Sequence, residues 1–267
     1  RWIMEVRDIW PESIKSVGAM KDSIIIRFFE FLEHRMYKKS DKIIVVTNSF
    51  KSYIIQEHEI DASKIEVVRN GVNKDFFKPI EKDHKLIKKL AVEDKFIISY
   101  IGTHGMAHAL DFILKSIKKA PENYHFVFVG AGAERERLLE LKEELDLTNL
   151  TMIGMVDKTE IKRYISISDV SLVNLKKSKT FKSVIPSKIF ENGAMHKPIL
   201  LGLEGETKDI VEKYDIGVAF EPENEKDFLK KVVEIKNKKI EKDRFELFIN
   251  DFDRKELAKK MLKFVIK

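Results

Sequence analysis

Short apolar segments alternate with longer segments of helical periodicity along almost the whole chain. Compact runs rich in Ile, Val and Phe predict buried strands, and spacings of three and four residues predict amphipathic helices. We expect strands at residues 2–6, 42–47, 65–69, 96–101, 125–129, 150–153, 170–175, 198–203 and 217–220. We expect helices at residues 21–39, 49–58, 106–119, 134–145, 159–167 and 206–214, one that opens near Ser187, and a last one at 254–265.

This alternation is typical of parallel sheets with helices on both faces, so the predicted fold class is α/β with parallel sheets. The pattern occurs twice, and residues 76–93, which are rich in charge and contain Pro79, separate the two occurrences. Such a break in apolar periodicity marks a domain boundary. We therefore expect two domains of similar architecture, of which the second is the more regular.

Composition and charge narrow the class of protein. With 43% hydrophobic and 35% charged residues the chain is a folded protein, and no apolar run is long enough to span a bilayer. The absence of cysteine excludes disulfides and thiolate metal sites, and it fits a reducing, cytoplasmic compartment. A net charge of +6 suits phosphorylated ligands or an anionic membrane surface. Basic residues are dispersed, so no nucleic-acid partner is expected.

Four loops marked by glycine or proline follow predicted strands, at residues 102–105, 130–132, 154–157 and 186–191. The carboxyl ends of parallel strands meet at one edge of a sheet, where ligands bind in such folds. The first loop consists of Gly102, Thr103, His104 and Gly105. Because it precedes a predicted helix, its N–H groups and the Thr103 hydroxyl suit a phosphate, although a structural turn is the alternative. Gly130 and Gly132 by themselves indicate only a tight turn.

The fourth loop leads into the helix that opens near Ser187. The free N–H groups of a helix opening suit a phosphate, and Lys188 adds a positive charge there. Glu191 lies one turn further on, where a carboxylate can accept hydrogen bonds from sugar or ribose hydroxyls. These residue types together indicate a site for a nucleotide diphosphate-sugar. The alternative is a capped helix on the sheet, with Lys188 and Glu191 simply solvated.

Motifs for other chemistries are missing or incomplete. His104 and His108 have the spacing of a metal pair on one helical face, but no third ligand is nearby, so no metal is expected. The sequence has no Gly-x-x-x-x-Gly-Lys-Ser/Thr loop, no Gly-x-Gly-x-x-Gly after a strand and no Gly-x-Ser-x-Gly turn. We therefore expect neither a P-loop ATPase, nor a nicotinamide cofactor, nor a serine hydrolase.

Two features of the first half each have two interpretations. Arg7 and Asp8 end the first strand, where they either contact a charged or hydroxylated substrate or form a local ion pair. The segment 24–39 is amphipathic and basic at one end, so it either packs on the sheet or makes a peripheral contact with a membrane surface.

The whole chain resembles the nucleotide-sugar glycosyltransferases of family 4, which have the two-domain GT-B fold. The order and spacing of several segments are those of the family: EVRDIWPES at 5–13, SDKIIVVT at 40–47, KIEVVRNGV at 64–72, GAGAER at 130–135, PSKIFE at 186–191 and GE at 205–206. Residues 7–11 and 102–108 look most like the bacterial branch that transfers N-acetylated sugars to lipid-linked acceptors in surface-polysaccharide synthesis.

This resemblance implies a retaining glycosyltransferase that moves a sugar, N-acetylated in the branch named, from a UDP-sugar to a lipid-linked or saccharide acceptor. The product would enter polysaccharide, O-antigen or capsule synthesis, and no cofactor would be needed. The choice of UDP over GDP rests on the resemblance alone. The enzyme would work in the cytoplasm or at the inner face of the membrane.

The resemblance also assigns roles to residues of this sequence. Loop 102–105 would face the diphosphate, and Gly130 and Gly132 would pass near the nucleotide. The remaining donor contacts would come from Met155, Val156, Pro186, Ser187, Lys188 and Glu191. Met155 and Val156 would hold the base, and Glu191 the ribose. The implied catalytic residues are Lys188, Glu191, Arg7 and Asp8. Lys188 would neutralise charge on the leaving diphosphate, while Arg7 and Asp8 would lie across the cleft near the acceptor.

The resemblance divides the chain into residues 1–78, 79–250 and 251–267. The first range would be the carboxy-terminal part of an acceptor-side Rossmann domain, the second the donor-binding domain, and the third a helix that packs back on the first domain. Since the chain starts at Arg1, directly before a strand, we expect the remainder of a longer protein with an incomplete first domain. Such a chain can bind a donor and yet fail to transfer.

The sequence departs from the family in two places. The family often carries two glutamates separated by seven residues, and here Glu191 is the second while Ser183 holds the first position. The usual Arg and Lys after the loop 102–105 are also not evident. Two other functions therefore stay open. One is a GT-B nucleotide-sugar epimerase or hydrolase that pairs His104 with Glu191 or Asp8. The other is a non-catalytic fragment that binds a nucleotide-sugar.

Overall fold

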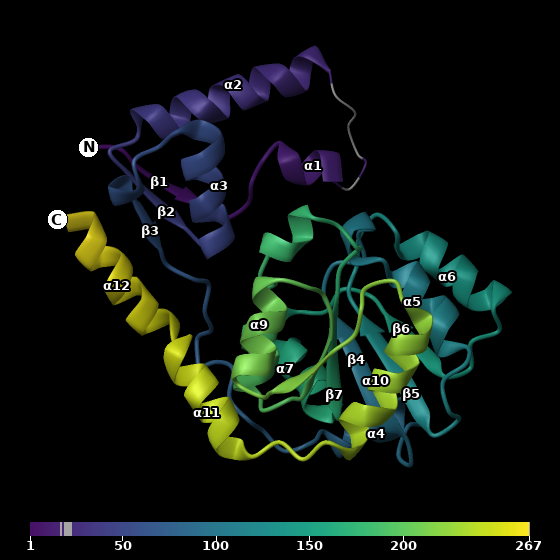
Figure 1. The fold of residues 1–267 in the computed structure, drawn as a ribbon. Helices are drawn as coiled ribbons and strands as arrows, with labels where there is room; N and C mark the ends of the chain where they lie inside the picture. The colour runs from purple at the N-terminus through teal and green to yellow at the C-terminus, as the bar shows by residue number, and fades with distance from the viewer. Residues whose placement is uncertain (17, 19–22, 267) are drawn as a thin grey trace.

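The structure, a computed structural model, describes residues 1–16, 18 and 23–266 and contains two parallel sheets (Figure 1). The small sheet has the order β1-β2-β3, with β1 (Ile3–Val6), β2 (Lys42–Val45) and β3 (Ile65–Val67). The large sheet has the order β6-β5-β4-β7-β8-β9. Its strands are β4 (Phe96–Ile101), β5 (Tyr124–Val129), β6 (Leu150–Ile153), β7 (Val170–Asn174), β8 (Ile199–Gly202) and β9 (Gly217–Ala219). The strands pair in parallel in both sheets, which confirms the predicted α/β class.

The helices of the small sheet are α1 (Glu12–Ser16), α2 (Ile24–Lys39) and α3 (Asn48–His58). The helix α3 begins after Thr47, whose hydroxyl oxygen accepts a hydrogen bond from the backbone N–H of Phe50 at 3.1 Å. The helix α2 begins after Ser23, which caps the N–H of Ile26 at 3.3 Å. Residues 21 and 22 of the predicted helix lie outside the described residues. The short helix α1 was not predicted.

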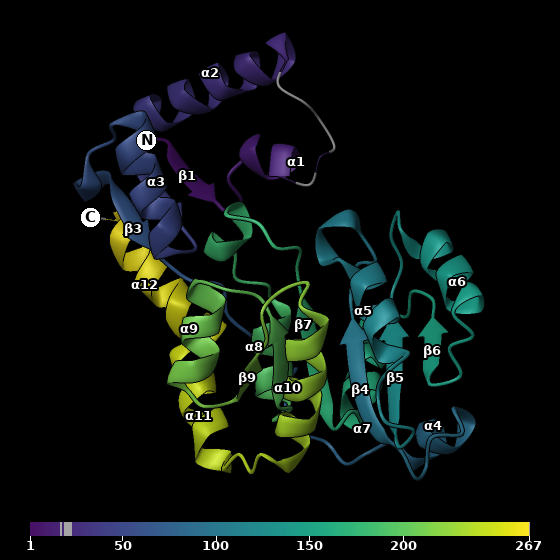
Figure 2. The same cartoon turned by 45° about the vertical axis from the view of Figure 1, so that its right-hand side comes forward.

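Both faces of the large sheet are buried, as helices lie in front of it and behind it (Figure 2). The strand β8 shows this directly, because Ile199 and Leu201 join one apolar cluster while Leu200 joins another. The helices are α4 (His84–Lys89), α5 (Leu110–Ile117), α6 (Arg135–Glu144), α7 (Lys158–Ile167), α8 (Lys188–Ala194), α9 (Glu206–Lys213) and α10 (Glu225–Asn237). The helix α4 lies in the charge-rich segment 76–93, where the sequence predicts a domain boundary and no helix.

One predicted helix is interrupted. Residues 106–119 form a single turn of 3-10 helix (Met106–His108) followed by α5, and Ala109 between them is left-handed with φ of 45°. A left-handed residue breaks the i to i−4 hydrogen-bond ladder of an α-helix. The expectation that the loop 102–105 opens directly into an α-helix is therefore wrong, and the dipole of α5 is not available to that loop.

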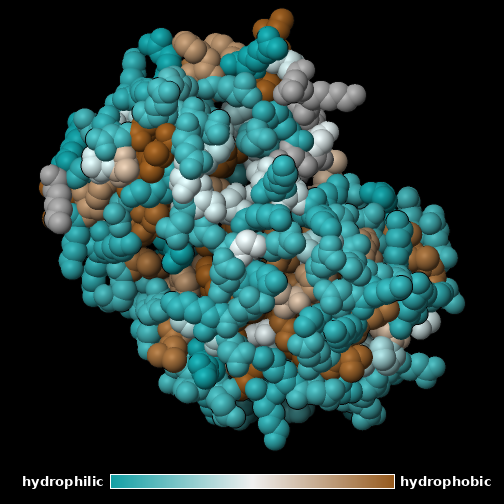
Figure 3. All heavy atoms as spheres, in the orientation of Figure 1, coloured by the Kyte–Doolittle hydropathy of each residue, from teal (hydrophilic) through white to brown (hydrophobic). Residues whose placement is uncertain are grey.

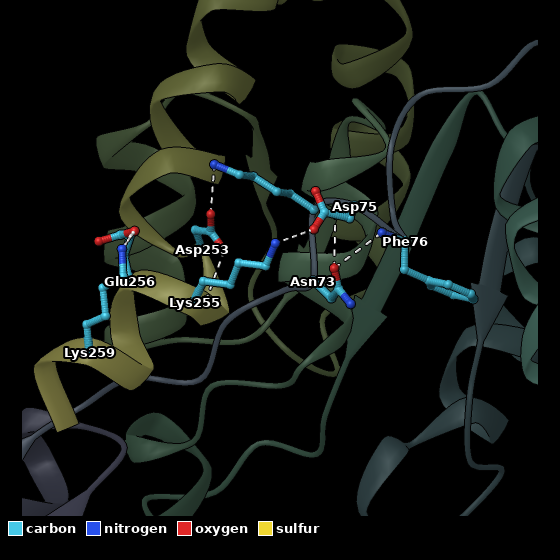
Figure 4. Close-up of polar contacts among 8 residues, drawn as sticks. Asn73, Asp75, Phe76, Asp253, Lys255, Glu256 and Lys259 are labelled. Atoms are coloured by element: carbon cyan, nitrogen blue, oxygen red, sulfur yellow. Dashed lines mark hydrogen bonds and ion pairs between the residues drawn. The ribbon is translucent and has the colours of Figure 1, made fainter. Parts of the chain in front are cut away.

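The chain passes between the two sheets twice, and the two passages are bonded together. The N–H of Val72 donates to the carbonyl of Phe252 at 2.9 Å, and the N–H of Arg254 returns a bond to Val72 at 3.0 Å. Gly71 permits this approach, because a Cβ there would lie 2.3 Å from the Phe252 carbonyl oxygen. The side chain of Lys255 adds an ion pair to Asp75 at 2.6 Å (Figure 4). The two passages thus act as one connection.

The last two helices start on one sheet and end on the other. The helix α11 (Lys242–Asp251) packs on α8, where the Phe190 and Phe248 rings stack with centroids 5.9 Å apart. The helix α12 (Arg254–Ile266) then runs along the small sheet (Figure 1). There the Lys260 ammonium donates to the carbonyl of Val67 at 2.7 Å. The carboxy-terminal helix therefore joins the small sheet to the part of the chain that carries α8.

Candidate donor site

The loops after β4, β5 and β6 enclose a cavity of about 210 Å³ at the carboxyl edge of the large sheet. Its lining residues are Ile101, Gly102, Thr103, Val129, Gly130, Ala131, Met155, Val156 and Ile161. Five of the predicted donor residues therefore lie together, namely Gly102, Thr103, Gly130, Met155 and Val156. Met155 is 84% exposed, so an apolar side chain stands free at the cavity mouth. Such a side chain is suited to cover the flat face of a base.

The glycines of the first two loops are required by the packing of the loops on each other. A Cβ at Gly130, whose φ is 148°, would lie 1.9 Å from the carbonyl oxygen of Gly102. A Cβ at Gly132, whose φ is 157°, would lie 2.4 Å from the carbonyl oxygen of His104. The N–H of His104 also donates to the carbonyl of Ala131 at 2.9 Å. The turn that Gly130 and Gly132 indicated is thus a lock between two loops.

Lys188 points from the start of α8 to the loop 102–105. A Cβ added to Gly102 would lie 2.8 Å from the Lys188 Nζ, and this nitrogen lies 3.7 Å from the centre of the Tyr100 ring. The Nζ is buried and has no hydrogen-bond partner among the described residues. Burial lowers the pKa of Lys188 to about 7, although the charge of Glu191 acts in the opposite direction. The alternative of a solvated Lys188 is therefore wrong.

Glu191 is half-buried on the next turn of α8. Burial raises the pKa of its carboxyl, while Lys158, Arg254 and Lys188 each lower it. Glu191 is therefore partly buried within reach of three positive charges, although it does not line the 210 Å³ cavity. The side chain of Ser187 makes no cap hydrogen bond to α8, so the alternative of a capped helix is not what the structure shows. Pro186 is half-buried and Ser187 exposed beside it.

The two histidines of the first loop region are neutral and enclosed. His104 is 0% exposed, and neither ring nitrogen has a hydrogen-bond partner among the described residues. Burial, followed by the charges of Arg135 and Lys188, lowers the pKa of His104 to about 4. Burial likewise lowers the pKa of His108 to about 4, and its Nδ1 lies 3.3 Å from the carbonyl of Asn174. Within the described residues no group of three His, Cys, Asp or Glu side chains is placed to hold a metal ion.

Arg7 and Asp8 lie on the small-sheet side and have separate partners. Arg7 donates to the side-chain oxygen of Asn70 at 2.7 Å, and Asp8 accepts from the hydroxyl of Ser13 at 3.0 Å. The alternative of an ion pair between these two neighbours is therefore not what the structure shows. Arg7 lines a second cavity, of about 440 Å³, between the small sheet and α12. Gly105 and Gly132 do not line the 210 Å³ cavity either.

Two residues that connect parts of the structure were not predicted from the sequence. Tyr100 occupies a strand position that looks like ordinary core, and only its contacts with Lys188 and the loop single it out. Glu206 belongs to the GE segment of the resemblance, but its contact with the small sheet has no signal in the spacing of residues.

Comparison of the fold defines the class. The chain superposes on HepE of Anabaena, solved in complex with UDP and glucose, with a TM-score of 0.80 and 15% identity, covering 98% of this chain and 71% of HepE. The fold is therefore GT-B, which confirms the predicted architecture. Residues 81–248 match the family model described as Glycosyl transferases group 1, and residues 13–76 match Glycosyltransferase Family 4. The chain belongs to the group 1 glycosyltransferases.

Two curated relatives match most of the chain. WbjE of Pseudomonas aeruginosa, named as a probable glycosyltransferase, is 25% identical over 221 residues, which are 81% of this chain and 55% of WbjE. TuaH of Bacillus subtilis (strain 168), named for a glycosyltransferase role in teichuronic acid biosynthesis, is 24% identical over 203 residues, 74% of this chain and 49% of TuaH. The chain thus spans about half the length of the curated relatives it matches.

Proposed function

We propose that this chain carries the donor half of a retaining glycosyltransferase that takes a sugar from a UDP-sugar and passes it to a lipid-linked or saccharide acceptor in bacterial polysaccharide synthesis. One observation carries the proposal: the Lys188 ammonium, buried and without a hydrogen-bond partner among the described residues, lies against Gly102, and Gly102 lines a cavity built from the loops of three strands. The family supports transfer of a sugar, and the naming of TuaH supports a polysaccharide product.

In this proposal the diphosphate lies over the loop 102–105. Its negative charge gives the Lys188 Nζ a hydrogen-bond partner. The N–H groups of Gly102 and His104 already donate to Val129 and Ala131, so the loop adds the N–H groups of Thr103 and Gly105 as donors. When the sugar leaves, charge grows on the β-phosphate, and a fixed cation in a buried site stabilises that charge strongly. Lys188, and no metal ion or other cofactor, takes this role. Glu191 binds the ribose hydroxyls, and Met155 and Val156 hold the uracil.

The acceptor is proposed to bind on the side of the small sheet. Arg7 lines the cavity of about 440 Å³ there, and Asp8 follows it in the chain. The proposal divides the chain into residues 1–78, 79–250 and 251–267 and places the enzyme in the cytoplasm or, as a peripheral protein, at the inner face of the membrane. No helix among the described residues has the length and apolar character to cross a bilayer. The N-acetyl group of the donor sugar stays a proposal that rests on the resemblance.

Calorimetric titration of the chain with UDP and with GDP tests the donor site. We expect UDP to bind more tightly than GDP, with the same affinity in EDTA. Replacing Lys188 by Ala removes a charge-assisted bond and should weaken UDP at least about tenfold. Glu191→Ala should also weaken it. Lys182→Ala is the matched control, because Lys182 is 52% exposed and pairs with Glu204 at 2.9 Å.

Three results would count against the proposal. Folded chain that binds neither nucleotide contradicts the donor site. Equal effects of Lys188→Ala and Lys182→Ala contradict the role of the Lys188 charge. Release of free or epimerised sugar from a UDP-sugar in the absence of acceptor favours the epimerase or hydrolase instead, for which the enclosed, neutral His104 is a poor acid.

A further inference from the structure

Tyr100 connects the cation of the proposed donor site to its phosphate loop. It lies near the end of β4 and is 0% exposed. Its ring lies under the Lys188 Nζ, 3.7 Å from ring centre to nitrogen. Its hydroxyl donates a hydrogen bond of 2.7 Å to the carbonyl of Thr103. One side chain on a rigid strand therefore contacts both parts that would meet a diphosphate.

The kind of contact matters because it leaves the ammonium group free to bind. A carboxylate beside Lys188 would neutralise the cation and compete with a phosphate for its N–H groups. An aromatic face attracts an ammonium ion through its quadrupole. It carries no negative charge, so it does not neutralise the cation as a carboxylate would. The Lys188 Nζ accordingly has no hydrogen-bond partner within the described part of the chain.

The other groups around Lys188 do not supply this attraction. His104 and His108 also lie against the Tyr100 ring, with centroids 5.9 and 5.8 Å away. Burial keeps the pKa of each at about 4, so both are neutral near pH 7, and any charge on them would repel Lys188. Glu191 lies further along α8 and favours the charged lysine only through space.

We propose that Tyr100 is a positioning residue for donor binding: its ring holds the Lys188 ammonium against Gly102, and its hydroxyl holds the Thr103 carbonyl and with it the loop 102–105. This inference rests on the proposed function of the site. The pKa of Lys188, which burial lowers to about 7 against the charge of Glu191, agrees with it, because no anion in contact with the ammonium restores the ordinary value. Binding of a diphosphate then raises that pKa and takes up a proton above pH 7.

The experiment is calorimetric titration with UDP between pH 6 and pH 9 on the full chain and three variants. Tyr100→Phe keeps the ring and loses only the bond to Thr103. Tyr100→Leu loses both. Phe128→Leu is the matched control, since Phe128 is also 0% exposed and its ring lies 5.5 Å from Tyr100. Among the described residues the ring that lies under the Lys188 ammonium is that of Tyr100 and not that of Phe128.

We expect UDP affinity of the natural chain to fall as pH rises above about 7. Tyr100→Leu should lose roughly tenfold in affinity at pH 8 and move this fall to lower pH. Tyr100→Phe should lose less affinity and leave unchanged the pH at which affinity falls, and Phe128→Leu should also leave this pH unchanged.

If Tyr100→Leu and Phe128→Leu behave alike in affinity and pH profile, the role of the ring is overturned. If Tyr100→Phe loses as much as Tyr100→Leu, the ring contributes nothing beyond the hydroxyl, and the proposal fails in that part.

A measurement without substitution at Tyr100 covers the case in which Tyr100→Leu does not fold. In chain labelled with ¹³C-lysine, the Lys188 side-chain protons should be shifted upfield by the ring current, and Lys188→Ala identifies the signal. Absence of an upfield lysine signal overturns the contact. Failure of the natural chain to bind UDP would instead remove the proposed function, so the two failures are distinct.

Discussion

The Glu206 carboxylate accepts a hydrogen bond from the backbone N–H of Ser49 at 2.6 Å, although Glu206 begins α9 and Ser49 lies in α3, 157 residues earlier in the chain. Its second oxygen lies 3.2 Å from the N–H of Asn48 and 3.6 Å from Arg69. A carboxylate thus occupies the positive end of α3. Through this contact the start of α9 is bonded to the start of α3, and Glu206 and Asn48 line one pocket with Phe252 of the paired chain passages.

Glu206→Ala should lower the free energy of unfolding by about 1 to 2 kcal/mol, because it leaves the first N–H groups of α3 without their acceptor. Urea denaturation measures this change. The control is Glu204→Ala, two residues away, where the carboxylate pairs with Lys182 at the surface. Similar losses from both substitutions would mean that the Glu206 contact adds no stability.

Gly130→Ala should destabilise the chain by about 3 kcal/mol or more and abolish UDP binding, because the added methyl group meets the Gly102 carbonyl at 1.9 Å. Gly154→Ala is the matched control after the neighbouring strand. A Cβ there meets only the Arg135 side chain, at 3.9 Å. Thermal unfolding followed by circular dichroism compares the two. An unchanged melting temperature for Gly130→Ala would contradict the lock between the loops.

The buried Glu33 should make stability depend on pH. Burial raises its pKa from 4.5 to about 7, partly offset by the hydrogen bond from Tyr37 at 2.7 Å. Between these values the folded chain holds a proton that the unfolded chain releases. The stabilisation is therefore full below pH 4.5 and is lost as pH rises through 7.

Glu33→Gln should remove this slope, which amounts to at most about 3 kcal/mol. Urea denaturation at pH 5 and pH 8 measures the difference between variant and natural chain. His58, whose pKa burial lowers, contributes a slope of opposite sign, and because its Nε2 lies 3.7 Å from the Glu33 carboxyl the two slopes are coupled. Glu30→Gln on the same helix controls for the loss of one carboxylate. A slope that survives in Glu33→Gln would assign the pH dependence to other groups.

The outer face of α2 should bind anionic membranes. Apolar atoms reach the surface at the top of the molecule, where Figure 1 places α2 (Figure 3). The exposed apolar side chains of this helix are Ile24, Ile25, Phe28, Phe31 and Met36. Its exposed cations are Arg27, Arg35, Lys38 and Lys39. Apolar and basic residues on one surface helix are typical of peripheral membrane contact.

Replacing Phe28 and Phe31 by Ser should weaken binding to vesicles with anionic phospholipid at least about tenfold in a sedimentation assay. Leu247 and Leu262, which are 55% and 57% exposed on α11 and α12, give the control when both are changed to Ser. Equal binding to vesicles without anionic lipid would contradict the role of the basic residues.

The local pattern was enough to predict most elements of the fold. Strands β4 and β6 have the predicted bounds, because each is a short and mainly apolar run that neighbouring segments do not resemble. The interruption at Ala109 could not be predicted, since a left-handed alanine is held by packing and not by its own preference. The helix α4 was not predicted, because most of its residues are charged and only Leu86 and Ile87 are buried.

The sequence by itself determined the alternation of strands and helices, the family, and which loops reach the carboxyl edge of the large sheet. These follow from short-range periodicity and from motifs whose residues are adjacent in the chain. Only the tertiary structure decided that Lys188 is enclosed on Tyr100, that Gly130 and Gly132 lock two loops together, that Arg7 and Asp8 do not pair, and that Glu206 binds the start of α3. The physical reason is that burial, pKa and ion pairing depend on which distant segments meet, and the pattern of one segment does not contain its partner.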